Sequence, residues 1–136
     1  MLPSTHLTKN FSVAELQCKC GCRLTRFAPG FLQALQELRD DFGAPMPINS
    51  ACRCAAHNAR VGGHPRSLHV GDKPVHNTGG TCAVDVGFPL GHPQRDRLIA
   101  LAESRGWSIG LNNRFVHLDR RTANARLPQG RFTYGS

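Results

Sequence analysis

Aromatic residues, acidic residues and long apolar runs are all scarce in this sequence. One Trp and one Tyr among 136 residues argue against a stacking surface for single-stranded nucleic acid. No apolar run approaches the roughly 20 residues that span a bilayer, so we expect no membrane-spanning segment. The first residues, 1–6, lack a charged region followed by an apolar core. We therefore expect no signal peptide and synthesis in the cytoplasm.

The shortage of acidic residues leaves the chain strongly basic. Asp and Glu number 9 against 17 Lys and Arg, which gives a formal net charge of +8 and a pI near 9.8. Such a balance favours polyanionic partners, among them nucleic acid and anionic envelope polymers. The positive residues are scattered and form no continuous block, so we expect association with an anionic envelope and no nucleic-acid partner. The length predicts one compact domain, and we expect a monomer.

Nucleophilic catalysis is disfavoured because no Gly-x-Ser-x-Gly elbow and no Cys–His arrangement is present. The six cysteines occur as Cys18-x-Cys20-x-Cys22, Cys52-x-Cys54 and Cys82. The expected lack of a signal peptide argues for reduced thiols at synthesis, and C-x-C is a less specific zinc signal than C-x2-C. Two interpretations stay open: a structural metal or disulfide joining the first cluster to Cys52 or Cys54, and ordinary buried thiols.

Apolar periodicity predicts two helices. Residues 30–42 place Phe31, Leu35 and Phe42 on one face, and residues 93–105 begin with a proline and end before a glycine. Ser12 and Glu15 form a capping box for a shorter helix, and one or two helical turns are expected at 55–60. Strands are predicted at 46–51, 82–86, 107–111 and 114–118, with a loop at 70–80 and polar coil from 122. We therefore predict a small α+β domain, with helices packed behind a short antiparallel sheet.

Three residues of zinc-ligand type lie along the second half of the chain. His69 follows a Gly-Gly turn, Asp85 follows a short apolar run, and His117 lies in another apolar run. Zinc accepts neutral imidazole and carboxylate, and catalytic sites use three protein ligands with one position left open. Arg53 precedes the set, and a further carboxylate, Asp119, follows it.

Several local motifs resemble the zinc D-Ala-D-Ala carboxypeptidase-like family, which also contains murein endopeptidases and many phage endolysins. They are Phe11-Ser12-Val13-Ala14-Glu15-Leu16, Cys18-x-Cys20-Gly21-Cys22, Ser50-Ala51-Cys52-Arg53-Cys54 with Val61-Gly62-Gly63, Ser67-x-His69, Ala83-x-Asp85 and Phe115-Val116-His117-x-Asp119. The resemblance implies a hedgehog/D-Ala-D-Ala peptidase-like fold. The resemblance covers most of the chain. It suggests a Cys-rich lead-in at 1–26, a catalytic core at 27–121 and a C-terminal coil at 122–136.

The resemblance also implies roles for individual residues. His69, Asp85 and His117 would bind Zn²⁺, and we expect the short antiparallel sheet to carry all three toward a shallow cleft. Arg53 would hold a carboxylate or carbonyl of the substrate, for which a planar guanidinium is well shaped. Ser67 would support the substrate site, although its hydroxyl could instead cap a turn. The alternative for Arg53 is a purely structural role, in a surface ion pair with Asp40 or Asp41.

The chain departs from the family pattern in two places. Fifteen residues separate His69 from Asp85, a longer spacing than the family's, and the extra length falls in the loop at 70–80. We favour Asp85 because loop insertions cost little when their ends stay close, with Asp72 as the rival ligand. His76 in the loop could approach the metal or the substrate, and a solvated loop residue is the more common interpretation.

The second departure concerns the general base. Arg114 and Phe115 occupy the positions where relatives carry a base, and neither side chain can serve. Asp119 is the remaining carboxylate of the motif. Three roles stay open for it: the base, a residue that orients a ligand, and a ligand itself beside His117.

These features lead us to expect a zinc metallopeptidase that hydrolyses amide bonds in peptidoglycan stem peptides or cross-links. A phage endolysin, released to act on the cell wall in the host periplasm or outside the cell, is the leading form. The alternatives are a bacterial D-Ala-D-Ala carboxypeptidase and a non-catalytic module that binds cell wall. A Cys-rich nucleic-acid binder, with metal held by Cys18, Cys20, Cys22 and Cys52, fits the charge but not the placement of His and Asp.

Overall fold

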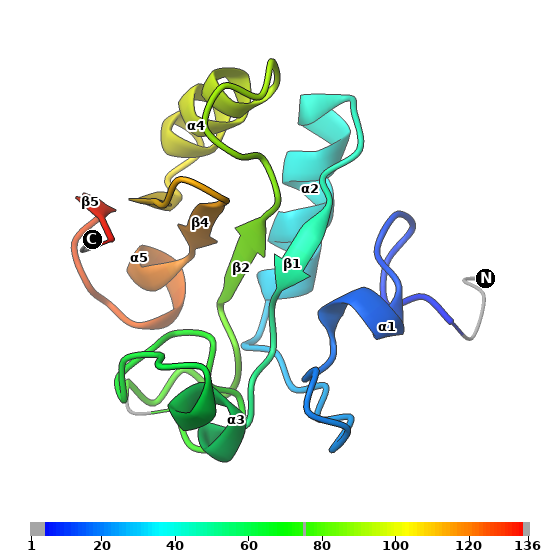
Figure 1. Ribbon diagram of the computed structural model, residues 1–136, viewed down its shortest axis with the longest axis vertical. Coiled ribbons are helices and arrows are strands. Elements are labelled where there is room, and N and C mark those ends of the chain that lie inside the picture. Colours follow the sequence, from blue (N-terminus) through cyan, green and yellow to red (C-terminus); the bar gives the residue numbers. More distant parts are fainter. Residues whose placement is uncertain (1–4, 75, 135–136) are drawn as a thin grey trace.

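A five-stranded sheet forms the centre of the fold in the computed structural model, which describes residues 5–74 and 76–134 (Figure 1). The strands are β1 (Ile48–Ser50), β2 (Ala83–Val86), β3 (Ser108–Leu111), β4 (Val116–Asp119) and β5 (Arg131–Thr133). Their order is β1-β2-β4-β3-β5, antiparallel except for the parallel β3–β5 pair. The predicted α+β class is confirmed.

The two central strands separate a core face from a polar face. Val84 of β2 and Leu118 of β4 are direct partners in the ladder, and both are fully buried in the hydrophobic core. Because successive side chains of a strand point to opposite faces, the neighbouring residues Asp85 and His117 share the other face. They are also direct partners, so the strand register by itself brings an aspartate beside a histidine.

Two helices supply most of the remaining core. They are α2 (Phe31–Phe42) and α4 (Arg95–Ser104), within one or two residues of the predicted ranges. In the view of Figure 1, α2 lies behind β1 and β2. The buried Leu35 of α2 and Leu98 of α4 belong to the same core as the strand residues. None of the helices in the described ranges has the length and apolarity needed to cross a bilayer.

The shorter helices are α1 (Val13–Leu16), α3 (Ala55–Arg60) and α5 (Arg121–Asn124). The predicted capping box is formed at α1, where the backbone N–H of Glu15 donates to Ser12 Oγ at 3.1 Å and the N–H of Ser12 donates to Glu15 Oε1 at 2.8 Å. The prediction of helical turns at 55–60 is confirmed by α3.

The prediction of mostly polar coil from residue 122 onward misses β5, which adds to the sheet beside β3. The ladder is extended by two bonds: Ile109 N–H donates to Gly130 O at 3.0 Å, and Tyr134 N–H donates to Leu111 O at 3.0 Å. The strand carries one apolar residue, Phe132, between two exposed polar ones. The sequence therefore has no hydrophobic pattern there that predicts a strand. Residues 135–136 of the predicted coil, 1–4 of the lead-in and 75 of the loop lie outside the described residues.

Candidate metal centre

His69, Asp85 and His117 come together on the polar face of the sheet. Asp85 Oδ1 lies 3.1 Å from His69 Nε2 and 3.1 Å from His117 Nδ1, and the three candidate ligand atoms lie within 4.8 Å of one another. All three side chains are almost completely buried. Only Asp85 and His117 stand on strands. The expectation that the sheet carries all three is wrong for His69, which lies in a turn.

The turn that carries His69 is fastened at both ends to the body of the domain. The carbonyl oxygen of His69 accepts hydrogen bonds from Arg53 N–H at 2.8 Å and from Thr81 Oγ1 at 2.8 Å. Nearby, Cys82 N–H donates to Leu68 O at 3.0 Å. The chain therefore leaves the site after His69 and returns to the same place before β2. This closure explains how fifteen intervening residues are compatible with a compact ligand group.

The outer nitrogens of both imidazoles are engaged with other groups, so the inner nitrogens, each 3.1 Å from Asp85 Oδ1, are the ones placed to bind a cation. His69 Nδ1 lies 2.7 Å from Ala51 O, and His117 Nε2 lies 2.8 Å from Asp119 Oδ2. A carbonyl oxygen only accepts, so the proton of neutral His69 is on Nδ1 and its Nε2 lone pair faces Asp85. Histidine ligands of metals are held in this way by carbonyls and carboxylates. Two imidazole nitrogens and one carboxylate oxygen fit zinc.

Asp119 is fully buried and every contact of its carboxylate goes to a cation or a donor. Its Oδ1 accepts from the backbone N–H and the Nε of Arg121 at 3.0 and 2.9 Å. Its Oδ2 accepts from Arg121 Nη2 at 2.8 Å in addition to its contact with His117. Sequence reasoning missed Arg121, whose position two residues after Asp119 is the only available signal.

The buried charges shift the pKa values of the group in a consistent pattern. Burial lowers the pKa of His69. Burial also acts to lower the pKa of His117, but hydrogen bonds to Asp119 and Asp85 outweigh it and raise the pKa to about 9. Burial acts to raise the pKa of Asp85, yet the two imidazoles keep it well below its usual range.

Arg53 connects the ligand group to the wall of the cleft. Its Nη2 lies 3.2 Å from Asp85 Oδ2, its Nη1 donates to Asn58 Oδ1 at 3.1 Å, and its Nε donates to Ser50 Oγ at 3.0 Å. The alternative of a surface ion pair is not realised, because Asp41 pairs with Arg105 at 2.9 Å. The guanidinium is thus held over the candidate centre by three separate partners.

The other candidates from the sequence have separate surroundings. Ser67 Oγ accepts from the His69 N–H at 3.2 Å, so it supports the turn while also lining the cleft. Asp72 accepts from Ala55 N–H at 2.9 Å at the start of α3 and is not part of the ligand group. His76 lines a different depression. The structure therefore places Asp85, and not Asp72, with the histidines.

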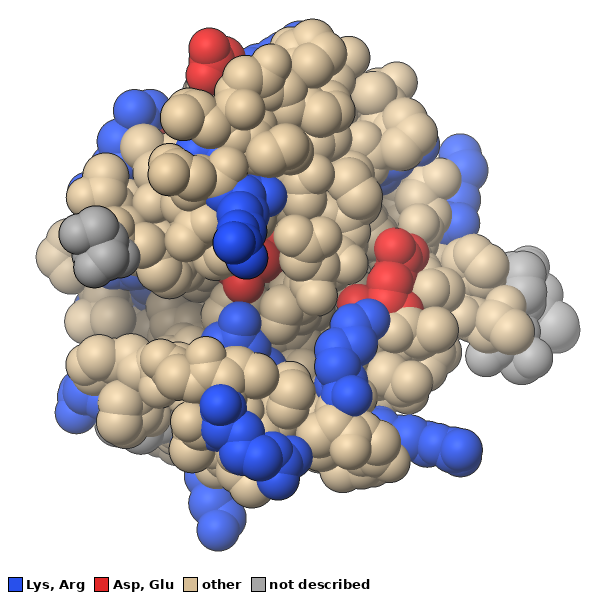
Figure 2. Space-filling model, in the orientation of Figure 1, with Lys and Arg blue, Asp and Glu red and all other residues tan. Residues whose placement is uncertain are grey.

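A cleft of about 770 Å³ opens over the group, and arginines line it. Figure 2 shows this face hollowed, with an acidic spot in the hollow and basic side chains on either side. The four cleft arginines are Arg53, Arg66, Arg114 and Arg121. Such a lining attracts ligands that carry carboxylates.

Strand β5 and Tyr134, the residue that follows it, supply an aromatic wall that sequence reasoning missed. The ring of Phe132 lies 5.5 Å from the ring of His117, and Tyr134 lies 6.3 Å from it. Gly110 makes this approach possible, since a Cβ there would lie 2.6 Å from the Phe132 ring and 2.9 Å from the Cβ of His117. The sequence did not predict this wall because the segment that carries it was predicted to be coil.

Comparison with protein families agrees with this geometry. The family model for peptidase M15 matches residues 9–119. The chain belongs to the peptidase M15 family. The resemblance drawn from the sequence motifs is therefore confirmed, and the buried His–Asp–His group is consistent with the zinc dependence of M15 peptidases. None of the curated proteins compared with the chain matches it.

Proposed function

We propose that this M15 peptidase hydrolyses an amide bond in the stem peptides or cross-links of peptidoglycan, with zinc held by His69, Asp85 and His117. The observation that carries the proposal is the convergence of these three buried ligands at the floor of an arginine-lined cleft. Zinc in such a site supplies a Lewis acid for a carbonyl and makes water a usable nucleophile near neutral pH.

Asp119 acts in this proposal as a positioning residue. The sequence left open whether it is the base, a ligand or an orienting group. Its carboxylate is fully buried, and both oxygens are already occupied by Arg121 and His117. A carboxylate with these contacts fixes the ring and tautomer of a metal-binding histidine and increases its basicity, so the contacts favour the orienting role.

Arg53 binds the substrate in this proposal. Stem peptides carry free carboxylates as well as amide carbonyls, and a guanidinium donates to either with charge-assisted hydrogen bonds. Arg53 is partly exposed, lines the cleft and is anchored by Asp85 and Asn58. It is therefore positioned to hold a substrate oxygen close to the ligand group, while Arg66 and Arg114 widen the basic lining.

We assign the protein the role of an endolysin that acts on the cell wall. Its net charge of +8 favours retention on an anionic envelope. A monomer is sufficient for this role, since all residues of the proposed site come from one chain.

Product analysis on purified peptidoglycan tests the proposal. Wild type, wild type with a chelator, His69→Ala and His76→Ala are compared, the last being a matched histidine control remote from the cleft. We expect new amine termini with wild type and His76→Ala only. The product masses identify the bond, because a carboxypeptidase releases terminal D-Ala whereas an endopeptidase divides stem peptides or cross-links.

Two results would overturn the proposed function. One is a folded, zinc-loaded wild type that releases no product from peptidoglycan. If that protein still pellets with purified sacculi, the fold serves as a wall-binding module. The other is product formation that survives both chelation and His69→Ala, which would separate hydrolysis from the ligand group.

A further inference from the structure

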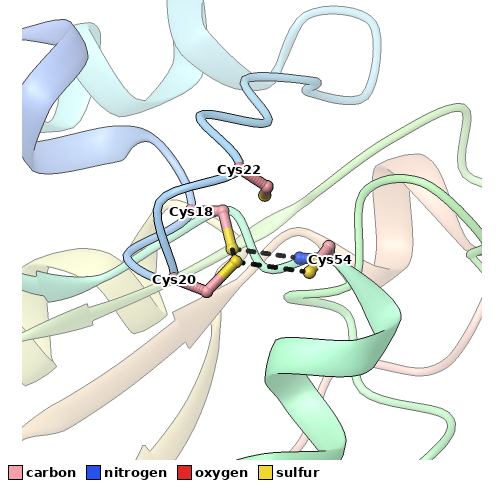
Figure 3. Close-up of side chains that lie close together, drawn as sticks. All are labelled: Cys18, Cys20, Cys22 and Cys54. Atoms are coloured by element: carbon pink, nitrogen blue, oxygen red, sulfur yellow. Dashed lines mark hydrogen bonds between the residues drawn. The ribbon is translucent and has the colours of Figure 1, made fainter.

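Four cysteines converge at a second place in the molecule, and none of them lines the cleft. Cys18, Cys20 and Cys22 lie in the loop after α1, and Cys54 is the residue that precedes α3. Figure 3 shows their side chains pointing toward one another from these two segments. Their Sγ atoms all lie within 4.8 Å of one another, although 34 positions separate Cys20 from Cys54.

The spacing of the sulfur atoms matches a tetrahedral thiolate site. Zinc–sulfur bonds of about 2.3 Å place tetrahedral ligands about 3.8 Å apart. The sulfur of Cys20 lies 3.5 Å from that of Cys18 and 3.8 Å from that of Cys54. These separations exceed the ~2.05 Å of a disulfide, and all four thiols are free.

Backbone donors already point at three of the four sulfurs. The N–H of Cys54 donates to Cys18 Sγ at 3.4 Å, and the N–H of His57 donates to Cys54 Sγ at 3.3 Å. The N–H of Leu24 donates to Cys22 Sγ at 3.5 Å. Hydrogen bonds of this kind favour the charged form of the acceptor, and the thiolate is the form of cysteine that binds metals.

The loop that carries three of the thiols is folded back on itself by the backbone. Cys18 N–H donates to Leu24 O at 2.8 Å and so closes the loop. Gly21 and Arg23 adopt φ values of +96° and +62°, a region in which glycine is favoured. The tight return brings Cys22 beside Cys18 and Cys20. A helix would direct Cys20 away from the other two, and a strand would place the three on one face but roughly 6–7 Å apart.

We propose that Cys18, Cys20, Cys22 and Cys54 bind a structural zinc ion as a tetrathiolate site, separate from the His–Asp–His centre. Four protein sulfurs complete the tetrahedral coordination of zinc and leave no open position for substrate, which is the mark of a structural site. The proposal stands on the cysteine geometry alone and does not depend on the proposed peptidase activity.

The expected partner of the first cluster was Cys52 or Cys54, and Cys52 was the fourth ligand in the nucleic-acid alternative. The structure selects Cys54 and corrects the assignment of Cys52, whose buried thiol donates to Arg26 O at 3.6 Å and is not in the group. The chain turns into α3 at Cys54, so two cysteines only two positions apart point to different places.

Zinc at this site would fasten the N-terminal segment to the substrate wall of the cleft. Cys54 directly follows Arg53 and caps α3, and that helix carries Asn58, which holds the Arg53 guanidinium. Residues 18–22 would then be joined to the catalytic core and would not form a separate lead-in. The site would reach the cleft through the position of Arg53.

Metal content and thiol chemistry test the proposal. Protein purified with a thiol reductant is measured by elemental analysis as wild type, His69→Ala, Cys54→Ser and Cys52→Ser, the last being a buried-cysteine control. We expect about two zinc ions per chain for wild type and for Cys52→Ser, and about one for each of the other two. Wild type holding about one zinc, with no further loss in Cys54→Ser, would overturn the proposal.

A second measurement needs no variant and covers the case in which Cys54→Ser does not fold. Wild type reconstituted with Co²⁺ is expected to show sulfur-to-cobalt charge-transfer absorption, and its four clustered thiols should resist alkylation until a chelator is added. Alkylation of Cys20 and Cys22 at the same rate with and without metal would contradict the proposal. A mass lower by two hydrogens would identify a disulfide in place of the metal.

Discussion

The two candidate metal sites of this protein rest on different supports. Asp85 and His117 are cross-strand partners in the middle of the sheet, and both imidazoles of that site have hydrogen-bonded outer nitrogens. The cysteine group rests on a loop, with Cys22 exposed, and on the residue that precedes a short helix. Ladder bonds and core packing order the first site, whereas the second rests on the Cys18 N–H to Leu24 O bond that closes its loop and on a few weak N–H to sulfur bonds.

This difference predicts separate consequences when each site loses its metal. A site built on packed strands keeps its shape, because the register is stabilised by many other contacts. A site built on loops gains much of its order from the metal, since the binding free energy of a structural zinc contributes to folding. Chemistry should therefore depend on the first group and chelator-sensitive stability on the second.

The largest effect is expected from Asp85→Ala. The change removes the carboxylate shared by His69, His117 and Arg53, so zinc at that site and peptidoglycan hydrolysis should both be lost. Leaving buried cationic groups without their partner should also destabilise the fold by about 3–5 kcal/mol. Elemental analysis, product release and urea unfolding measure the three effects.

The matched control for Asp85→Ala is Asp41→Ala. It breaks the more exposed ion pair with Arg105 and should change stability by about 1 kcal/mol or less. Hydrolysis retained at the wild-type rate in Asp85→Ala would show that Asp85 belongs to no catalytic site.

Metal removal should separate the two groups by their effect on stability. Chelation of wild type is expected to lower stability by several kcal/mol, because structural thiolate sites contribute strongly to folding. His69→Ala should retain most of this chelator-sensitive stability and Cys54→Ser should lose most of it. Thermal unfolding with and without chelator measures both. A larger loss of chelator-sensitive stability in His69→Ala than in Cys54→Ser would contradict the proposed difference between the site on the sheet and the site on the loop.

A smaller effect is expected from Asp119→Asn. The amide keeps the size of the side chain but no longer supplies the charge that orients His117 and pairs with Arg121. Loss of such a supporting carboxylate typically lowers metal affinity or activity about 10–100-fold. Zinc titration and the rate of hydrolysis provide the readouts.

The Asp119 prediction separates two roles. An unchanged affinity for zinc combined with complete loss of hydrolysis would contradict the positioning role and indicate direct participation in the reaction. Weaker zinc binding together with hydrolysis that recovers at high zinc concentration would support the positioning role.

The narrowest effect is expected from Arg53→Lys, because hydrolysis should change and zinc content should not. Lysine keeps the charge but loses the planar fork that contacts Asp85, Asn58 and Ser50. Loss of about one charge-assisted hydrogen bond to the substrate should lower kcat/KM about tenfold to a hundredfold. Zinc content should remain unchanged. A wild-type kcat/KM would exclude Arg53 from substrate binding.

Much of the fold could be predicted because its signals are local. The helical spacing of Phe31, Leu35 and Phe42 reflects a face that must be buried, and α2 follows it. The capping box at Ser12 and Glu15 is likewise a local device. Short apolar runs around Asp85 and His117 indicated β2 and β4 for the same reason. The proposed zinc ligands could likewise be predicted from their residue types and local motifs.

Other features depend on residues that are distant in the chain, and only the tertiary structure decided them. Phe132 stands in a strand because β3 offers an open edge, not because its neighbours are apolar. Cys54 joins the cluster in place of Cys52 because the chain turns into α3 there. The sequence by itself determined which elements form and which ligand types are available. Tertiary packing decided which of those residues meet, because each meeting requires contacts between segments that no local pattern encodes.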